Sequence, residues 1–327
     1  AIPYFNQYTN DIQPDIHHYH TLPFQIVEHW TRQYLRFKIN QRARVTYIFN
    51  PTLVIKYSDI DLSLEQRLAL LNARICLTIG SGDIMKCNLL TNLFVCSLLD
   101  AEEESDTAGE LRIPLMVFRD RALPICTLAY HDMEIQIEDL PGPSSKFQYT
   151  LEWEAIISPS EDHRVLCQNG LQYYMLQTQD QMDDKEFIQL NFNHVVNFIL
   201  VRIIPTKADS ICDYISLQPY LESAEFLADG LQPPVIFTAE QMIEYEFMGI
   251  KLYAIPLSPK VLNRRILADY IQNNKLDMVG VNFSRFDDIL LRLNVDGGAG
   301  GNYTYMVTAV NVNVGRHLGG MGGVAFS

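Results

Sequence analysis

The sequence predicts an all-β fold in which two similar-sized sets of short strands follow one another along the chain. It contains 17 tyrosines and 16 phenylalanines together with many runs of Val, Ile and Thr, and all of these residues favour strands. Several segments alternate apolar and polar residues, most clearly residues 130–138, as half-buried strands do. Many short strands separated by turns are typical of sandwiches, barrels and jelly rolls. No repeat of about 20 to 50 residues indicates a solenoid or a propeller.

The first segment, residues 1–23, is polar, aromatic and punctuated by proline, which predicts an extended N-terminal arm. Strands are expected next. Asn50-Pro51, between two of them, suits a bend or an edge position because proline cannot donate to a strand ladder. The expected strands are FQIVEHW (24–30), QYLRFKI (33–39), RVTYIF (44–49) and TLVIKY (52–57).

Two short helices are expected within this first set. Residues 63–73 read SLEQRLALLNA, with Ser63 as the N-cap and apolar residues on one side. Residues 89–99 are apolar nearly throughout, which predicts a buried helix. Between the two helices, the sequence Gly-Ser-Gly-Asp at 80–83 indicates a tight turn between two strands.

The first set ends with strands at 112–118, 127–139 and 147–157, after an acidic loop at 100–110. The polar sequence SPSEDHR then separates the two sets, and helices are expected to be few. The strands expected in the second set are LQYYMLQT (171–178), FIQLNF (187–192), VVNFILVRII (195–204), IKLYAIPL (250–257), ILLRLNV (289–295) and YTYMVTAVNVNV (303–314).

The charge and the cysteines exclude several classes of function. The formal net charge is −14, and the densest basic stretch, residues 32–44, alternates with apolar residues. No direct binding to nucleic acid is therefore expected, because such proteins carry a basic patch. The six cysteines form no CxxC pair, which favours reduced thiols over disulfides or a zinc site. No apolar run reaches the roughly 18 residues of a membrane-spanning helix.

Three clusters could carry chemistry, and each has a simpler interpretation. HHYH at 17–20 could bind a metal or belong to a polar arm. His131-Asp132 and His194 could belong to an acid–base site or make structural hydrogen bonds at strand ends. Glu152 and Glu154 flank Trp153, as in a carbohydrate site, but they also fit a solvated strand surface. We expect no catalytic residue, no cofactor and no metal.

Two glycine-rich pentapeptides, at 297–301 and 319–323, lie about twenty residues apart in the sequence. Neither has the Lys-Ser/Thr pair of a phosphate-binding loop. GGAGG (297–301) is expected to be a hairpin loop between two strands. GGMGG (319–323) is followed by apolar residues that favour burial, so it is expected to form a turn with positive φ that docks this segment, with its methionine as a plug. The residues concerned are Gly319, Gly320, Met321, Gly322 and Gly323.

Five segments in order resemble the double jelly-roll major capsid proteins of nucleocytoplasmic large DNA viruses, the group of iridoviruses and their relatives. The resemblance is recognisable from residue 110 onward and weak before it. The segments are IPLMVFRDRALPICTLAYHDMEIQIED (113–139), LEWEAIISPSEDHRVLCQNGLQYYMLQTQ (151–179), FIQLNFNHVVNFILVRI (187–203), NFSRFD (282–287) and AVNVNVGRHLGGMGGVAFS (309–327).

Two of these segments supply the site residues that the resemblance implies. The first is the corner Asn193-His194, where Val195 stands in place of the proline that is usual in the family. The second resembles the family's stretch Asn-Phe-Ser-Arg-aliphatic-Asp, with Phe286 at the aliphatic position. Its matching residues are Asn282, Phe283, Ser284, Arg285 and Asp287.

The resemblance implies two tandem eight-stranded jelly rolls with few short helices. The boundaries are then an arm at 1–23, a first jelly roll at 24–158, a connector at 159–172 and a second jelly roll at 173–327. It also implies a homotrimeric, pseudo-hexameric capsomer that tiles an icosahedral virus shell. Minor capsid proteins at the base of the shell and an inner membrane layer beneath it are the implied partners.

The implied location is the virion, after assembly in the host cell, and the unpaired cysteines agree with a cytoplasmic site. Two alternatives remain. A scaffold or minor capsid protein could share the same fold, and a jelly-roll carbohydrate-binding protein or enzyme could use Trp153 with its flanking glutamates, or His131.

Overall fold

The structure is a computed structural model of the 327-residue chain. It describes residues 20–23, 34–39, 47–57, 63–98, 106–107, 109–116, 123–140, 147–156, 164, 167–229, 233–257, 280–296 and 303–324. The strand expected at 24–30 and most of the arm expected at 1–23 lie outside these residues. The last four residues of that arm form a strand.

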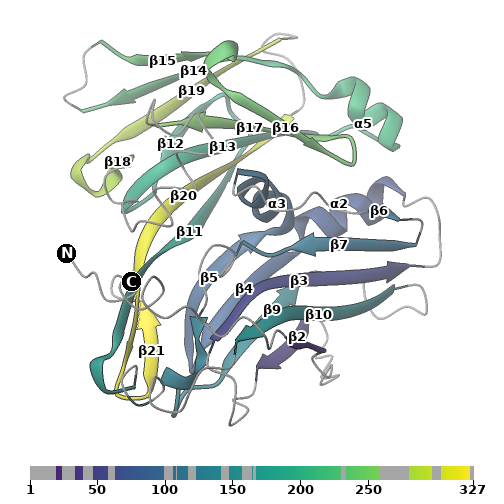
Figure 1. The fold of residues 1–327 in the computed structure, drawn as a ribbon. Helices are drawn as coiled ribbons and strands as arrows, with labels where there is room; N and C mark the ends of the chain where they lie inside the picture. Colours follow the sequence, from purple (N-terminus) through teal and green to yellow (C-terminus); the bar gives the residue numbers. More distant parts are fainter. Residues whose placement is uncertain are drawn as a thin grey trace.

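The first half of the chain forms two antiparallel sheets (Figure 1). Sheet A has the order β1 (His20–Pro23), β10 (Phe147–Ile156), β3 (Tyr47–Tyr57), β7 (Glu110–Pro114) and β6 (Asp106–Thr107), and β8 (Leu123–Pro124) also pairs with β3. Sheet B has the order β2 (Tyr34–Ile39), β9 (Met133–Glu138), β4 (Arg74–Ile79) and β5 (Gly82–Asn88).

The second half forms two further antiparallel sheets. Sheet C has the order β11 (Leu171–Asp183), β20 (Tyr303–Leu318), β13 (Val195–Pro205), β17 (Ile250–Pro256) and β16 (Ile243–Phe247). Two short strands extend it: β18 (Val281–Asn282) pairs with β13, and β21 (Met321–Val324) pairs with β20. Sheet D has the order β12 (Phe187–Leu190), β19 (Ile289–Val295), β14 (Leu221–Ala228) and β15 (Val235–Thr238).

The two halves have the same strand topology. When the short strands β6, β8, β16, β18 and β21 are set aside, the described residues of each half keep eight strands, which can be numbered by their order in the chain. Sheets A and C then both read 1-8-3-6, and sheets B and D both read 2-7-4-5. This pairing of first with last strand, and of second with seventh, is that of a jelly roll. The expected fold of two tandem eight-stranded jelly rolls is confirmed.

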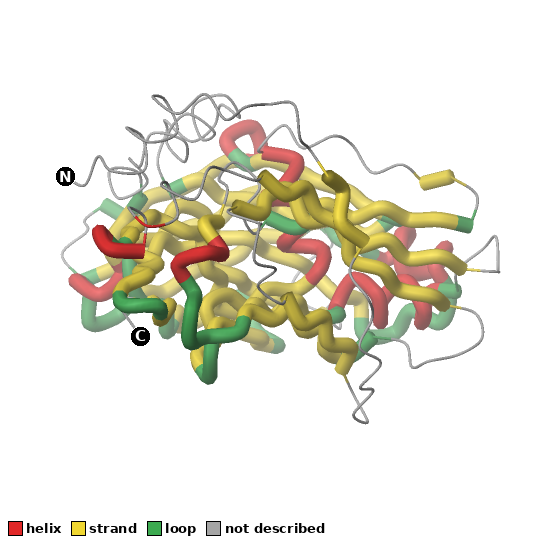
Figure 2. The backbone as a smooth tube through the Cα atoms, turned by 60° about the horizontal axis from the view of Figure 1, so that its bottom comes forward, coloured by secondary structure: helices red, strands yellow, loops and turns green. Residues whose placement is uncertain are grey.

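The described helices are short, as Figure 2 shows from a second direction. α2 (Leu64–Asn72) begins at Ser63, whose Oγ accepts a hydrogen bond from Gln66 N at 3.2 Å, while Ser63 N donates to Gln66 Oε1 at 2.9 Å. This reciprocal pair is a capping box, so the expected N-cap is confirmed. α3 (Leu89–Leu98) and α5 (Ile211–Leu217) follow, with 3₁₀ turns η2 (Ile125–Thr127), η3 (Ala239–Gln241) and η6 (Phe283–Arg285).

Helices α2 and α5 occupy equivalent places in the two jelly rolls. Each lies between the third and the fourth strand of its own roll, α2 between β3 and β4 and α5 between β13 and β14. The repeat therefore extends from the sheets to a connecting helix.

The hairpin expected at GGAGG is wrong. Residues 297–301 lie outside the described part of the chain, but the strands on either side are β19 and β20. These strands belong to different sheets, D and C, so the segment connects two sheets and cannot close a hairpin. Strand alternation alone carries no information about which sheet a strand joins.

Candidate functional site at the junction of the two jelly rolls

Helix α3 joins the two jelly rolls. It is apolar and buried along nearly its whole length, and Figure 1 shows α2 and α3 between the rolls. The ring of Phe94 lies edge-on to Phe198 of β13 at 6.2 Å and to Tyr245 of β16 at 5.8 Å, measured between ring centroids. Edge-to-face pairs at this separation are favourable. A helix of the first roll therefore packs on the outer face of sheet C.

Strand β13 is buried on both faces as a consequence. Ile199 and Val201 belong to the core between sheets C and D. Phe198 and Leu200, on the opposite face, belong to a second apolar cluster that is continuous with the core of the first roll. The apolar run at 195–204 lacks alternation because neither of its faces meets water, a pattern typical of strands covered on both sides.

Polar contacts connect the rolls at the sheet edges. From β11, Gln177 Nε2 donates to Ile84 O and Thr178 Oγ1 donates to Lys86 O, both on β5. From β13, Arg202 Nη1 donates to Asn72 Oδ1 of α2 at 2.6 Å. The two bonds from β11 to β5 place the edge of sheet C against the edge of sheet B, and the third joins β13 to helix α2.

The segment that contains GGMGG forms a hairpin with strand β20. Gly319 and Gly320 have φ of +60° and +84°, the left-handed values of a two-residue turn that glycine adopts without strain. β21 then returns along β20 beside the first roll (Figure 1). Tyr130 N donates to Gly320 O at 2.8 Å. The structure therefore places these glycines in a turn that docks on the loop before β9.

Strand β21 approaches the first roll closely. A methyl group at Gly322 would lie 2.7 Å from Leu128 Cδ2 and 2.9 Å from Ile79 Cγ2, so this position has no room for a side chain. His131 Nδ1 lies 3.2 Å from Gly322 N. Met321 is 52% exposed, so the expected methionine plug is wrong. In this hairpin Gly322, next to Met321, makes the close contact with the first roll.

His317 is a buried residue that sequence reasoning missed. It is 1% exposed, with Nδ1 2.8 Å from Thr127 Oγ1 and Nε2 3.3 Å from Tyr173 OH. Burial lowers the pKa of His317 to about 4. Tyr173 packs over Gly315, its partner across the strands, where a methyl group would lie 2.5 Å from the ring. The alternation of β20 places His317 on the face of Asn311 and Asn313, opposite the neighbouring valines, so no local signal in the sequence indicated its burial.

The corner at Asn193-His194 and the NFSRFD segment bind one another. His194 has φ of +68°, and its backbone N donates to Ser284 Oγ at 3.0 Å. Phe283 N donates in return to His194 O at 2.9 Å. Asn282 Oδ1 accepts a hydrogen bond from Ser284 N at 3.1 Å, which caps η6. We call these four residues, His194 and 282–284, the corner clasp.

The other residues of the two motifs lie around the clasp. Phe283 is buried in the core between sheets C and D, so the clasp fixes the corner to the core. Asn193 N donates to Gln179 Oε1 of β11 at 2.9 Å. Arg285, the last residue of η6, and Asp287, which follows that turn, are exposed. Two segments about 90 residues apart in sequence thus form one structural unit.

Comparison with solved structures shows the same architecture in viral capsids. The chain matches the PBCV-1 virus capsid with a TM-score of 0.67 and 15% identity over 95% of this chain and 97% of the other. It matches PBCV-1 VP54, fitted into a reconstruction of the virophage Sputnik, with a TM-score of 0.68 and 16% identity over the same shares. The Faustovirus major capsid protein matches with a TM-score of 0.55 and 8% identity over 91% and 90%. No protein-family model and no curated protein matches the sequence.

The chain has the double jelly-roll fold of viral major capsid proteins. The expected resemblance is confirmed at the level of the fold, because identities this low carry the backbone arrangement alone. The match spans nearly the whole chain, so it includes both rolls and the junction between them.

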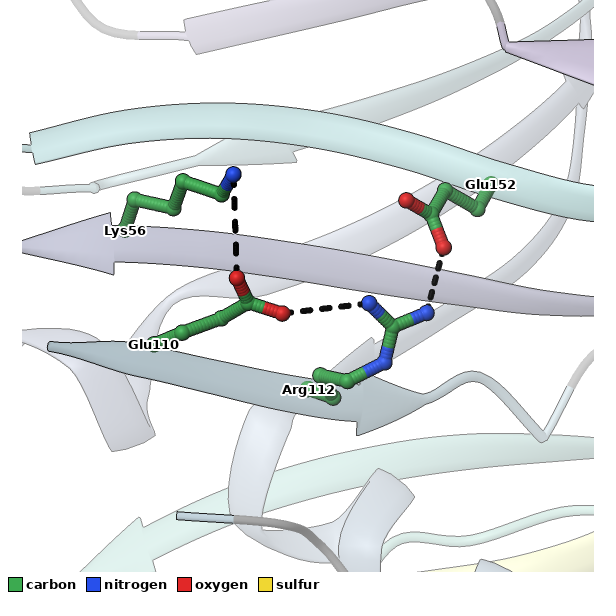
Figure 3. A network of polar contacts seen from close by, with 4 residues as sticks. All are labelled: Lys56, Glu110, Arg112 and Glu152. Carbon is green, nitrogen blue, oxygen red and sulfur yellow. Dashed lines mark hydrogen bonds and ion pairs between the residues drawn. The ribbon is translucent and has the colours of Figure 1, made fainter. Parts of the chain in front are cut away.

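Trp153 and Glu152, which could have belonged to a carbohydrate site, instead stabilise this double jelly-roll fold. Trp153 is 7% exposed and belongs to the core of the first roll, so it cannot form an aromatic platform. Glu152 pairs with Arg112 Nη2, and Arg112 Nη1 lies 3.1 Å from Glu110 Oε1 (Figure 3). Lys56 Nζ lies 3.7 Å from Glu110 Oε2. The hydrogen bond to Glu152 is the main cause that raises the pKa of Arg112.

These four residues, Lys56, Glu110, Arg112 and Glu152, form what we call the sheet A network. They come from three neighbouring strands, β3, β7 and β10, on the outer face of sheet A (Figure 3). Val54 lies beneath them and is buried. All four side chains stay partly exposed, so each ion pair stabilises the fold by about 1 kcal/mol at most.

The structure also locates the remaining candidate ligands. Within the described ranges, no three His, Cys, Asp or Glu side chains gather as metal ligands. HHYH lies outside them except for His20. None of the six cysteines forms a disulfide, and burial raises the pKa of the Cys76 and Cys126 thiols to about 12. No helix in the described part of the chain is long and apolar enough to cross a membrane.

Proposed function

We propose that this chain is a major capsid protein that assembles as a homotrimeric, pseudo-hexameric capsomer and tiles an icosahedral virus shell. The observation that carries the proposal is the pair of jelly rolls with one strand order, packed side by side through a buried junction. The match to the PBCV-1 virus capsid over 95% of the chain supports it.

The topology suits a tile physically. Each chain contributes two similar rolls, so three chains around a threefold axis supply six, and six similar units fill a hexagonal outline. A head-to-tail contact between copies closes into such a ring when its rotation divides a full turn. The buried junction fixes the angle between the two rolls of one chain. Three of the six contacts between neighbouring rolls in such a ring are therefore already set within the chains.

The partners follow from the same proposal. Minor capsid proteins at the base of the shell and an inner membrane layer beneath it are the expected neighbours, and the virion is the location. Six cysteines that form no disulfide fit assembly in the reducing cytoplasm of a host cell. The net charge of −14 fits a shell that makes no direct contact with nucleic acid.

The motif residues act as structural elements in this proposal. The corner clasp joins the residue before β13 to β18 and η6, and Asn193 ties the corner to β11. The turn at Gly319 and Gly320, with Gly322 and Gly323 after it, docks β21 on the first roll. Arg285, Asp287 and Met321 are among the exposed members of the set, and their side chains are available to contact another copy.

Electron microscopy of the purified protein tests the function. We expect particles with threefold symmetry and six barrel-shaped densities. Uniform particles with only two barrels would contradict the proposal. Finding the protein as the most abundant species of purified virus particles separates a major capsid protein from a scaffold, which leaves before maturation.

A further inference from the structure

Two of the six cysteines contact each other where the first roll meets the start of the second. Cys167 Sγ donates a hydrogen bond to Cys126 O at 3.2 Å, and the two thiols also hydrogen-bond to each other. The residues are 41 positions apart in the sequence, so the fold brings them together. Cys126 lies in η2 of the first roll, and Cys167 lies just before β11, the first strand of the second roll.

The backbone around Cys126 is held in place on both sides. Ile125 and Thr127 are buried, and Leu128 N donates to Ile125 O at 3.1 Å. Thr127 Oγ1 lies 2.8 Å from His317 Nδ1 of β20. Cys126 itself is partly buried and packs on the core of the first roll. The position of this thiol is therefore set by its neighbours.

The segment that carries Cys167 packs on the same strand, β20. Residues 167–169 are helical and lead through Gly170 into β11. A methyl group at Gly170 would lie 3.0 Å from His317 O, and Leu171 pairs with His317 across β11 and β20. Both thiols therefore belong to segments that pack around His317. Proximity of this kind is what a disulfide requires, because the Cα atoms that it joins lie within about 7 Å of each other.

Exposure distinguishes this pair from the other cysteines. Cys76, Cys87 and Cys96 are buried, so a reagent in solution does not reach them. Cys212 is exposed on α5. Cys167 is exposed too, and it has a second thiol beside it. Because exposed thiols are the ones that react with small disulfides, oxidation of the pair begins at Cys167.

We propose that Cys126 and Cys167 form a modification site in which a small-molecule disulfide, such as oxidised glutathione, converts the two thiols to a disulfide bond. The bond ties η2 of the first roll to the segment that enters β11 of the second roll. Every group that the site uses belongs to one chain, so the site goes beyond the proposed capsomer and does not depend on it.

The reaction consists of two thiol–disulfide exchanges. In the first, the Cys167 thiol loses its proton and attacks one sulfur of oxidised glutathione, whose S–S bond breaks as the bond to Cys167 Sγ forms. One glutathione leaves as a thiolate and takes up a proton. In the second, the Cys126 thiol loses its proton and attacks Cys167 Sγ, and the other glutathione leaves in the same way. The two cysteines lose two electrons, which reduce the glutathione disulfide to two thiols.

The environment of Cys126 sets the order of the two steps. Burial, and then the charge and hydrogen bond of Cys167, raise the pKa of Cys126 to about 12. A thiol that stays protonated is a poor nucleophile, so Cys126 does not attack first. Once Cys167 carries glutathione, its own thiolate no longer opposes ionisation of Cys126. Burial still does, and closure of the bond is therefore the slow step.

The bond changes the stability of the chain. It closes a loop that contains β9 and β10, and closing a loop of this length restricts the unfolded chain. The melting temperature is expected to rise by about 5 °C. If the chain is the capsid protein proposed above, the thiols are reduced during cytoplasmic assembly and the bond forms after release. This timing alone rests on the proposed function.

Incubation of the purified full-length protein with oxidised glutathione tests the proposal. Peptide mapping under non-reducing conditions is expected to find Cys126 linked to Cys167 in the same chain. Cys212 is the internal control, because it is exposed but is expected to stop at the mixed disulfide with glutathione. C126S is expected to retain glutathione on Cys167. The rise in melting temperature is expected in the oxidised wild type, to disappear on reduction, and to be absent from C167S treated in the same way.

Two results would overturn the inference. One is a wild type in which glutathione stays on Cys167 while Cys126 remains a thiol. The other is a bond that joins two chains instead of closing within one. Neither result affects the proposed function, because the assay needs no assembled particle and electron microscopy of the reduced protein tests the capsomer separately.

Discussion

At the scale of single residues, several positions are determined by what lies opposite them. Gly322 faces Leu128 and Ile79, Gly315 faces the Tyr173 ring, and His317 lies between Thr127 and Tyr173. All three contacts join segments far apart in the sequence. The glycines and the apolar residues that follow them predict a docked turn. The local pattern cannot predict that this turn contacts residues some 190 positions earlier in the chain.

Gly322→Ala is expected to destabilise the protein by about 1–3 kcal/mol, because the added methyl group overpacks the contact with Leu128 and Ile79. Gly323→Ala is the matched control, since no atom lies within 4 Å of its would-be methyl group. Urea unfolding of both variants checks the difference. Equal stabilities for the two variants would show that β21 is not docked.

His317→Gln is expected to flatten the dependence of stability on pH. The folded pKa of about 4 lies below the ordinary value of 6.5, so the unfolded chain takes up a proton first as pH falls. The stability that the neutral imidazole contributes is full above pH 6.5 and is lost toward pH 4. Between pH 7.5 and 5 this loss is about 2 kcal/mol.

Chemical denaturation at several pH values measures this effect as the difference between wild type and H317Q. The difference removes the contribution of Asp180 and of the other titratable groups that both proteins share. Parallel stability curves for the two proteins would contradict the burial of a neutral His317.

At the scale of elements, the predicted helices and strands that fall within the described residues lie close to their observed places, whereas α5, β14, β15 and β16 were not predicted. The capping box of Ser63 and the alternation at 130–138 are local signals, and local signals are what a sequence carries directly. Sheet membership is not local. The expected GGAGG hairpin is wrong because β19 and β20 pair with different strands, a choice made by the whole jelly roll.

The corner clasp shows what the sequence predicts and what it does not predict. Asn193-His194 and NFSRFD stand out through a family resemblance, while nothing in either segment alone indicates that they touch. The bonds between His194 and Ser284 or Phe283 become visible only once β18 pairs with β13.

Phe94→Ala is expected to cost about 3–5 kcal/mol, because it opens a cavity between α3, Phe198 and Tyr245. The exposed Phe187 provides a control, and its change to alanine is expected to cost below about 1 kcal/mol. Guanidinium unfolding checks both. A small effect of F94A would mean that the junction between the rolls contributes little to stability.

At the scale of the whole molecule, one topology is used twice and the two copies are joined by a buried junction. The sequence indicates two sets of strands from the polar break after residue 157, and the resemblance supplies the jelly-roll order. The sequence does not predict that α2 and α3 pack against sheet C. An apolar helix can be buried in the core of its own roll as easily as between two rolls.

Deleting residues 319–327 is expected to prevent formation of a soluble trimer. The deletion removes β21 and leaves the edge of β20 and the loop at 128–131 uncovered. Size-exclusion chromatography of the truncated protein checks this. A truncated chain that elutes with the wild type would show that the hairpin is dispensable for assembly.

The oligomeric state of the full-length protein in analytical ultracentrifugation tests the central claim most directly. A chain that contributes two of the six rolls of the proposed capsomer is predicted to sediment as a stable trimer across a wide range of concentrations. A monomer that persists at every concentration would contradict the account.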